Sequence, residues 1–336
     1  MIEAQWRTSA HAIADRTPLF RAMKQAAGSE ADCLRCHAPL TGQVDPALQA
    51  SKEAITCDAC HLLRHVVPSR QGATLVHELG DNVKFGPFCD LPDNYFHKVG
   101  CSPLHAESAF CGGCHLYYVP TRQGPLPVFT EYEEWLALGE KTETQTCQSC
   151  HMPGGTAEIA VGATSRIGVG HHGFFGDQRT LRRTALAVSA SLRQSPQLLR
   201  VQLSVSNNLA QHSVPTGLPG RRVRLAVSVE DPAGAVVERK ELFFARILVD
   251  DTGVEVPFYA ATRVGSDNRL LADETRQVSF ELKAPAAGVV RIEVDWLATG
   301  DEVGQTLAVA LAPEPLRSVV LHYGPHRPLP RTVKLK

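Results

Sequence analysis

The chain has 336 residues, with 34 Lys and Arg against 35 Asp and Glu, which gives a formal net charge of −1. The chain has neither an excess of basic residues nor a long block of one charge, so we do not expect a nucleic-acid partner. No run approaches the roughly 18 apolar residues of a membrane span, and the mean hydropathy is −0.11. We therefore expect no membrane span.

Residues 1–180 and 181–336 differ in pattern, and the length of the chain also favours two domains. The first part is interrupted by Gly and Pro between short helical runs such as 3–27 and 129–139. This pattern predicts a mostly helical and loop domain with little apolar core of its own.

The second part changes to strict alternation, with Leu199, Val201, Leu203 and Val205 on one face of a half-buried strand. The signature recurs at residues 223–229, 278–282 and 290–296, and further runs lie at residues 185–192, 241–249 and 317–322. About seven strands predict an all-β, immunoglobulin-like sandwich. The complete prediction is a multidomain α+β protein, although the strand order is left open.

All ten cysteines lie between residues 33 and 150, and eight of them form four complete Cys-x-x-Cys-His motifs. The motifs are Cys33-Leu34-Arg35-Cys36-His37, Cys57-Asp58-Ala59-Cys60-His61, Cys111-Gly112-Gly113-Cys114-His115 and Cys147-Gln148-Ser149-Cys150-His151. In c-type attachment, two thiols form thioethers with the haem vinyl groups and the adjacent His binds the iron as proximal ligand. The motifs predict four covalently bound haem c groups, with His37, His61, His115 and His151 as proximal ligands.

Two other readings of these motifs fit less well. A zinc site does not require a His after every second Cys, whereas all four motifs have one. A thioredoxin-type redox pair would need a surrounding βαβ pattern, which these residues lack. Haem also explains the thin core of the first domain, because four macrocycles supply apolar surface for the chain to wrap. We therefore expect a haem-packed domain that is largely unfolded without its cofactor.

Histidine is the expected sixth iron ligand. The sequence has only three methionines, Met1, Met23 and Met152, and Met152 follows a proximal His, where it cannot reach the far face of the same haem. Bis-His ligation lowers the haem potential relative to His/Met ligation. Ten histidines outside the motifs are available to supply the distal ligands.

Several stretches resemble secreted multihaem cytochromes c, a group that includes tetrahaem electron carriers like the partner of hydroxylamine oxidoreductase. They are Trp6-Arg7-Thr8-Ser9-Ala10-His11-Ala12, Lys84-Phe85-Gly86-Pro87, His105-Ala106-Glu107-Ser108-Ala109-Phe110, Glu133-Glu134-Trp135, 147–153, His172-Gly173-Phe174-Phe175-Gly176 and His212-Ser213-Val214-Pro215-Thr216-Gly217. The last resembles a His-x-x-Pro-Thr-Gly loop ahead of a β-sandwich in some members. The resemblance implies His11, His105, His172 and His212 as distal ligands. His97 competes with His105, and His171 competes with His172. His65 is held in reserve, and His77, His322 and His326 are interpreted as structural or exposed.

Cys89 and Cys101 are the two cysteines outside the motifs. Haem c is attached in an oxidising compartment, where two spare cysteines are expected to pair. We therefore predict a disulfide and a periplasmic or extracellular location. The N-terminus lacks the pattern of a secretory signal, so we expect that a signal was removed or that the numbering begins inside a precursor.

The leading functional hypothesis is an electron carrier with mostly bis-His haems, which needs no catalytic residues and exchanges electrons with redox partner proteins. One alternative is an enzyme in which a haem with an open coordination site acts on a small nitrogen or sulfur compound. Another is a subunit of an extracellular cytochrome filament, with copies of the chain as partners. The sequence leaves the oligomeric state, the redox partner and the pairing of distal histidines with individual haems open.

Overall fold

The computed structural model describes residues 2–48, 53–139, 144–174 and 178–335. The chain divides into two compact units. The N-terminal unit comprises Met1–Gln178, Phe258–Thr262 and Thr306–Val309, and the C-terminal unit comprises Arg179–Pro257, Arg263–Gln305 and Ala310–Lys336. In the described ranges, no helix is long and apolar enough to cross a membrane.

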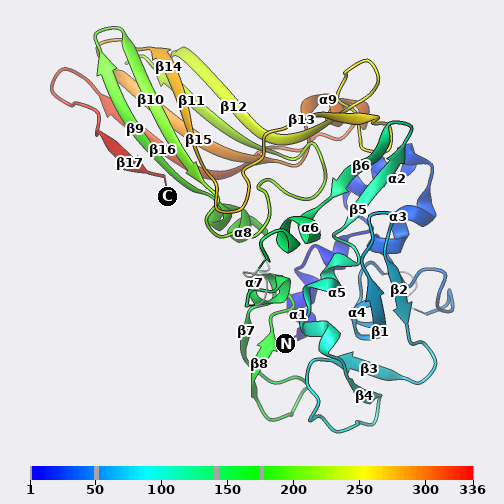
Figure 1. Cartoon of the computed structure of the whole chain (residues 1–336). Helices are drawn as coiled ribbons and strands as arrows, with labels where there is room; N and C mark the ends of the chain where they lie inside the picture. The colour runs from blue at the N-terminus through cyan, green and yellow to red at the C-terminus, as the bar shows by residue number, and fades with distance from the viewer. Residues whose placement is uncertain (1, 49–52, 140–143, 175–177, 336) are drawn as a thin grey trace. The chain divides into compact units, whose positions relative to one another are not determined.

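Short helices alternate with two-stranded sheets in the N-terminal unit (Figure 1). The helices are α1 (Ile2–Arg7), η1 (His11–Ile13), α2 (Pro18–Ala27), α3 (Glu30–His37), α4 (Cys57–His61), η3 (Pro103–Ala106), α5 (Ser108–Gly112), α6 (Glu131–Leu136) and α7 (Cys147–His151). The antiparallel pairs are β1 (Leu63–Val67) with β2 (Thr74–His77), β5 (Tyr117–Thr121) with β6 (Gly124–Phe129), and β7 (Gly154–Ala157) with β8 (Arg166–Gly170). One parallel pair joins β3 (Val83–Gly86) to β4 (Lys98–Cys101).

The helical run expected over residues 3–27 is broken into α1, η1 and α2. Local signals explain where α2 begins and ends. The hydroxyl of Thr17 accepts a hydrogen bond from the backbone N–H of Phe20, Pro18 occupies the first turn, and Gly28 ends the helix at φ +68°. A polar N-cap, an early proline and a left-handed glycine are ordinary helix boundaries.

Two antiparallel sheets share one apolar core in the C-terminal unit (Figure 1). Their strands are β9 (Ala187–Ser195), β10 (Leu198–Ser206), β11 (Arg222–Glu230), β12 (Val236–Val249), β13 (Arg263–Asp267), β14 (Thr275–Lys283), β15 (Gly288–Leu297), β16 (Glu314–Tyr323) and β17 (Thr332–Lys334). The strand orders are β14-β10-β9-β17 and β13-β12-β11-β15-β16. Two further helices among the described residues are α8 (Gln178–Ala185) and α9 (Asp301–Thr306).

The alternating apolar residues form the core of these sheets. Leu199, Val201, Leu203 and Val205 of β10 have no exposed surface, and Phe244 of β12 is 1% exposed. Side chains on alternate positions of a strand point to the same face of its sheet. The alternation in the sequence therefore marks the buried face of each long strand.

The predicted fold class is wrong in both halves. The structure is 20% helix and 37% strand, and the first half contains four small sheets where helix and loop were expected. Nine described strands form sheets of four and five in the C-terminal unit, so the seven-strand immunoglobulin-like sandwich is not found. Strands of three to six residues, such as β17 and those of the N-terminal unit, are too short to show the alternation on which the prediction rested.

We predict that a fragment of residues 179–336 folds without cofactor, because its core consists of its own side chains. In this fragment Phe244→Ala should lower the free energy of unfolding by about 3–5 kcal/mol. Val236→Ala is the matched control, since Val236 is 60% exposed and its loss should cost no more than about 0.5 kcal/mol. Urea unfolding followed by circular dichroism measures both, and an unfolded parent fragment would contradict the prediction.

Candidate functional site

Each of the four motifs lies on or at the end of a short helix of the N-terminal unit. Helical spacing places the two cysteines of a motif on one face, because residues three apart are neighbours on a helix. Thr56 and Thr146 directly precede the second and fourth motifs and cap them, accepting hydrogen bonds from Ala59 N at 3.0 Å and Ser149 N at 3.3 Å. The threonine before the first cysteine is the local signal that starts α4 and α7.

The cysteines of different motifs converge. The thiols of Cys36 and Cys114 lie close enough to shift each other's pKa, as do those of Cys111 and Cys147. Burial raises the pKa of Cys60 to about 12. None of the eight motif cysteines is in a disulfide, so eight thiols from four helices are held in one unit.

His11 lies among the imidazoles of three motifs. Burial, together with the nearby imidazoles of His115, His151 and His37, lowers its pKa to about 4. Its ring also makes an edge contact with Phe174, with ring centroids 4.3 Å apart. At pH 7 the ring of His11 is therefore neutral, as a metal ligand must be.

A second group of histidines surrounds His61. The ring of His105 is stacked at a centroid distance of 5.4 Å and that of His172 at 6.1 Å. Burial lowers the pKa of all three, that of His105 to about 4. The proximal candidate of the second motif and two of the expected distal candidates thus come together as neutral imidazoles.

Backbone carbonyls fix the tautomers of four predicted ligands. The Nδ1 atoms of His37, His61, His172 and His212 are bonded to the carbonyl oxygens of Ala14 at 2.7 Å, Phe85 at 2.5 Å, Gly170 at 2.8 Å and Ser213 at 3.1 Å. A carbonyl only accepts, so each Nδ1 carries the hydrogen and each Nε2 carries the lone pair. Such hydrogen bonds orient imidazole ligands in metal sites.

Two other histidines have the opposite tautomer. His105 donates from Nε2 to Cys60 O at 3.1 Å, and His77 donates from Nε2 to Ala59 O at 3.0 Å. The Nδ1 atoms of both rings are buried and have no hydrogen-bond partner. Buried polar atoms are seldom left without a hydrogen-bond partner. His77 and Ala59 are 18 positions apart in the sequence, so no local pattern predicts their contact.

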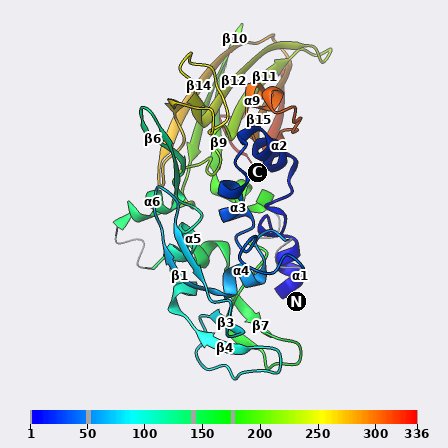
Figure 2. The ribbon, with the colours of Figure 1, turned by 90° about the vertical axis from the view of Figure 1, so that its right-hand side faces the viewer.

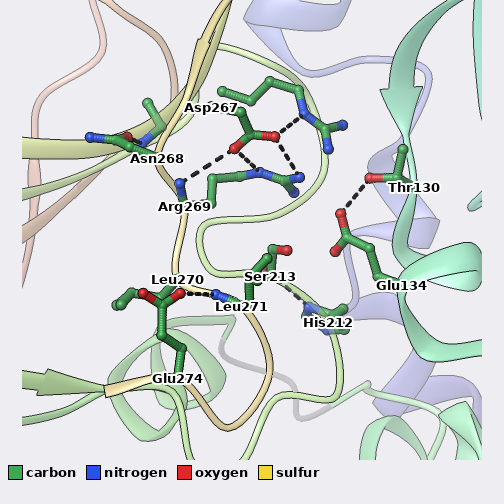
Figure 3. Close-up of polar contacts among 12 residues, drawn as sticks. Thr130, Glu134, His212, Ser213, Asp267, Asn268, Arg269, Leu270, Leu271 and Glu274 are labelled. Carbon is green, nitrogen blue, oxygen red and sulfur yellow. Dashed lines mark hydrogen bonds and ion pairs between the residues drawn. The ribbon is translucent and has the colours of Figure 1, made fainter. Parts of the chain in front are cut away.

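His212 belongs to a rigid loop of the C-terminal unit (Figure 3). The fully buried Asn207 donates from Nδ2 to the carbonyls of His212 at 2.9 Å and Leu271 at 3.0 Å. Val214 and Leu270 form an antiparallel bridge, so the loop lies beside the segment that precedes β14. This framework presents the His212 ring from a fixed backbone.

The reserve candidates have different surroundings. His65 is exposed on β1. His97 is bonded through Nδ1 to the carbonyl of Lys98 at 3.0 Å, and Nδ1 of His171 accepts from Gly173 N at 3.2 Å. Phe175 and Gly176 of the resemblance lie outside the described residues.

The remaining cysteines, Cys89 and Cys101, form a disulfide with their Cα atoms 4.6 Å apart. In the part of the chain that the structure describes, no group of three or more His, Cys, Asp and Glu is arranged to hold a bare metal ion. Thiols in pairs, each pair followed by an imidazole, suit a group that brings its own equatorial ligands. The residues present therefore fit haem c.

The chain is similar to a known structure over nearly its whole length. No protein-family model and no curated protein matches the chain. The penta-heme cytochrome c552 from Thermochromatium tepidum is 24% identical and is similar over 96% of each chain, with a TM-score of 0.76. A putative beta-galactosidase from Bacteroides fragilis covers 41% of this chain and 16% of its own, with 14% identity and a TM-score of 0.22. This chain therefore shares its fold, over nearly its whole length, with the penta-heme cytochrome c552.

Proposed function

We propose that the chain is a tetrahaem c-type cytochrome that transfers electrons. The observation that carries this proposal is the gathering of four complete Cys-x-x-Cys-His motifs, with neutral histidines between them, in one unit. The fold shared with a penta-heme cytochrome adds support. We propose four haems and not five, because the sequence has four motifs.

Bound haem supplies reversible one-electron chemistry. The cysteines tether it through thioethers, and His37, His61, His115 and His151 are the proposed proximal ligands. The carbonyls of Ala14 and Phe85 keep the Nε2 lone pairs of His37 and His61 available to the metal.

His11, His105, His172 and His212 are the proposed distal ligands. The rings of His61 and His172 are neighbours, with centroids 6.1 Å apart, so His172 is the proposed candidate for the iron that His61 would bind. His105 offers its lone pair on Nδ1, which favours a neighbouring site. His97, His65 and His171 remain the reserves.

We further propose a periplasmic or extracellular location and redox proteins as partners. Thioether formation and the Cys89–Cys101 disulfide both belong to oxidising compartments. A formal net charge of −1 gives no support for a nucleic-acid partner.

The first test is stoichiometry. Denatured protein should retain four haem adducts in a mass spectrum, because thioethers survive unfolding. The double variant Cys147→Ala, Cys150→Ala should retain three. As a control, Cys89→Ala with Cys101→Ala should retain four. Bound zinc or fewer adducts in the parent chain would refute the assignment.

The second test asks whether His212, in the C-terminal unit, is the sixth ligand of one iron. If His212 binds an iron, His212→Ala should convert one haem of four to high spin in the electron paramagnetic resonance spectrum of the oxidised protein. His322→Ala is the control, because His322 is exposed on β16 of the same unit. An entirely low-spin spectrum for His212→Ala would mean that His65, His97 or another chain supplies the sixth ligand.

The third test is a spectroelectrochemical titration. Since methionine is rare in the chain, all or nearly all midpoint potentials should lie below those of His/Met cytochromes c. A titration dominated by high-potential haems would contradict bis-His ligation.

A further inference from the structure

Only the third motif has glycine at both intervening positions, and both glycines are buried. A Cβ atom on Gly112 would lie 2.7 Å from the ring of Tyr132 on α6. One on Gly113 would lie 2.9 Å from the side chains of Leu75 and Val66 on the β1–β2 hairpin. Such distances are too short for a close-packed interior, so glycine is needed for α5 to pack directly against both neighbours.

The corresponding positions of the first and fourth motifs are more open. Leu34 and Gln148 are half-buried, and Arg35 and Ser149 are exposed. The two intervening residues of the third motif are therefore more enclosed than those of the first and fourth motifs, whereas His115 itself is exposed.

Helix α5 contacts the helix of the fourth motif directly. The hydroxyl of Ser108, which is 3% exposed, accepts a hydrogen bond from Cys147 N at 2.9 Å. The thiols of Cys111 and Cys147 lie close enough to shift each other's pKa. One cysteine of each motif therefore lies at the contact between the two helices.

The same region also contacts the first and second motifs. The thiols of Cys114 and Cys36 lie close enough to shift each other's pKa. His105, on η3 directly before α5, donates from Nε2 to the carbonyl of Cys60 at 3.1 Å. The third motif and its flanking turn thus meet each of the other three motifs.

The cysteines of the four motifs differ in how exposed they are. Cys57 and Cys150 are exposed, whereas the other six motif cysteines are half-buried. Cys57 also lines a cavity of about 300 Å³ together with Trp6 and Asp58. A group attached at Cys57 or Cys150 would be bound through a thiol at the protein surface.

We propose that the third motif, on α5, is the junction through which electrons pass between the other three, and that the second and fourth motifs are the sites of exchange with partner proteins. This inference rests on the proposed function. In each step one iron is oxidised from ferrous to ferric and its neighbour is reduced from ferric to ferrous. A one-electron donor protein and a one-electron acceptor protein begin and end the transfer, and no proton or bond change is required.

The first experiment is a redox titration of the full haem-loaded protein, followed by nuclear magnetic resonance with the haem signals assigned to motifs. Neighbouring charges interact more strongly than distant ones. Oxidation of the third haem should therefore shift the potential of each other haem more than those three shift one another. The proposal would be overturned if the largest shift in potential were between two haems other than the third.

A second experiment turns the junction into an electron trap. His115→Met should raise the potential of the third haem and slow electron equilibration between the second and fourth motifs at least tenfold after flash photoreduction. His37→Met is the matched control on the first motif and should change that rate less than twofold. Equal slowing by both variants would overturn the junction. A parent protein with fewer than four haems would instead overturn the proposed function.

Discussion

The hydrogen bond from a histidine Nδ1–H to a backbone carbonyl is the interaction on which the site depends. It decides which ring nitrogen carries the lone pair and which way the ring faces. The acceptors come from separate segments: Ala14 from the turn after η1, Phe85 from β3, Gly170 from β8 and Ser213 from a loop of the C-terminal unit. The small sheets of the N-terminal unit thus hold carbonyls at fixed positions, as in Figure 2, where β3 lies near α4.

The two units bury apolar surface by different means. Of the twelve largest fully buried side chains, ten belong to the C-terminal unit and only Leu40 and Val128 to the N-terminal unit. Since burial of apolar area is the main favourable term in folding, the sheets can be stable through their own side chains. The N-terminal unit has less such surface, and a large apolar cofactor would supply the difference.

Sequence patterns predicted the long strands and the motifs because both signals are local. The alternation from Leu199 to Val205 follows from the period of a strand, and the motif spacing follows from one turn of helix. The contacts that arrange the site join distant residues. Gly154 pairs with Gly170 across a hairpin, and His105 meets Cys60 across 45 residues. No local sequence pattern predicts such contacts, so the tautomer of His105 and the hydrogen bond of His77 to Ala59 could not be predicted.

The disulfide has a consequence for the order of assembly. The ring of Phe85 fits over Gly100 of β4, where a Cβ atom would lie 2.4 Å from it, and Phe85 supplies the carbonyl that orients His61. Cys101 ends β4 and closes the loop to Cys89. Cross-linking a loop lowers the conformational entropy of the unfolded chain. For a loop of some 15 residues this stabilises the folded chain by about 3 kcal/mol. Formation of this disulfide can therefore order the segment that orients His61 before any cofactor is bound.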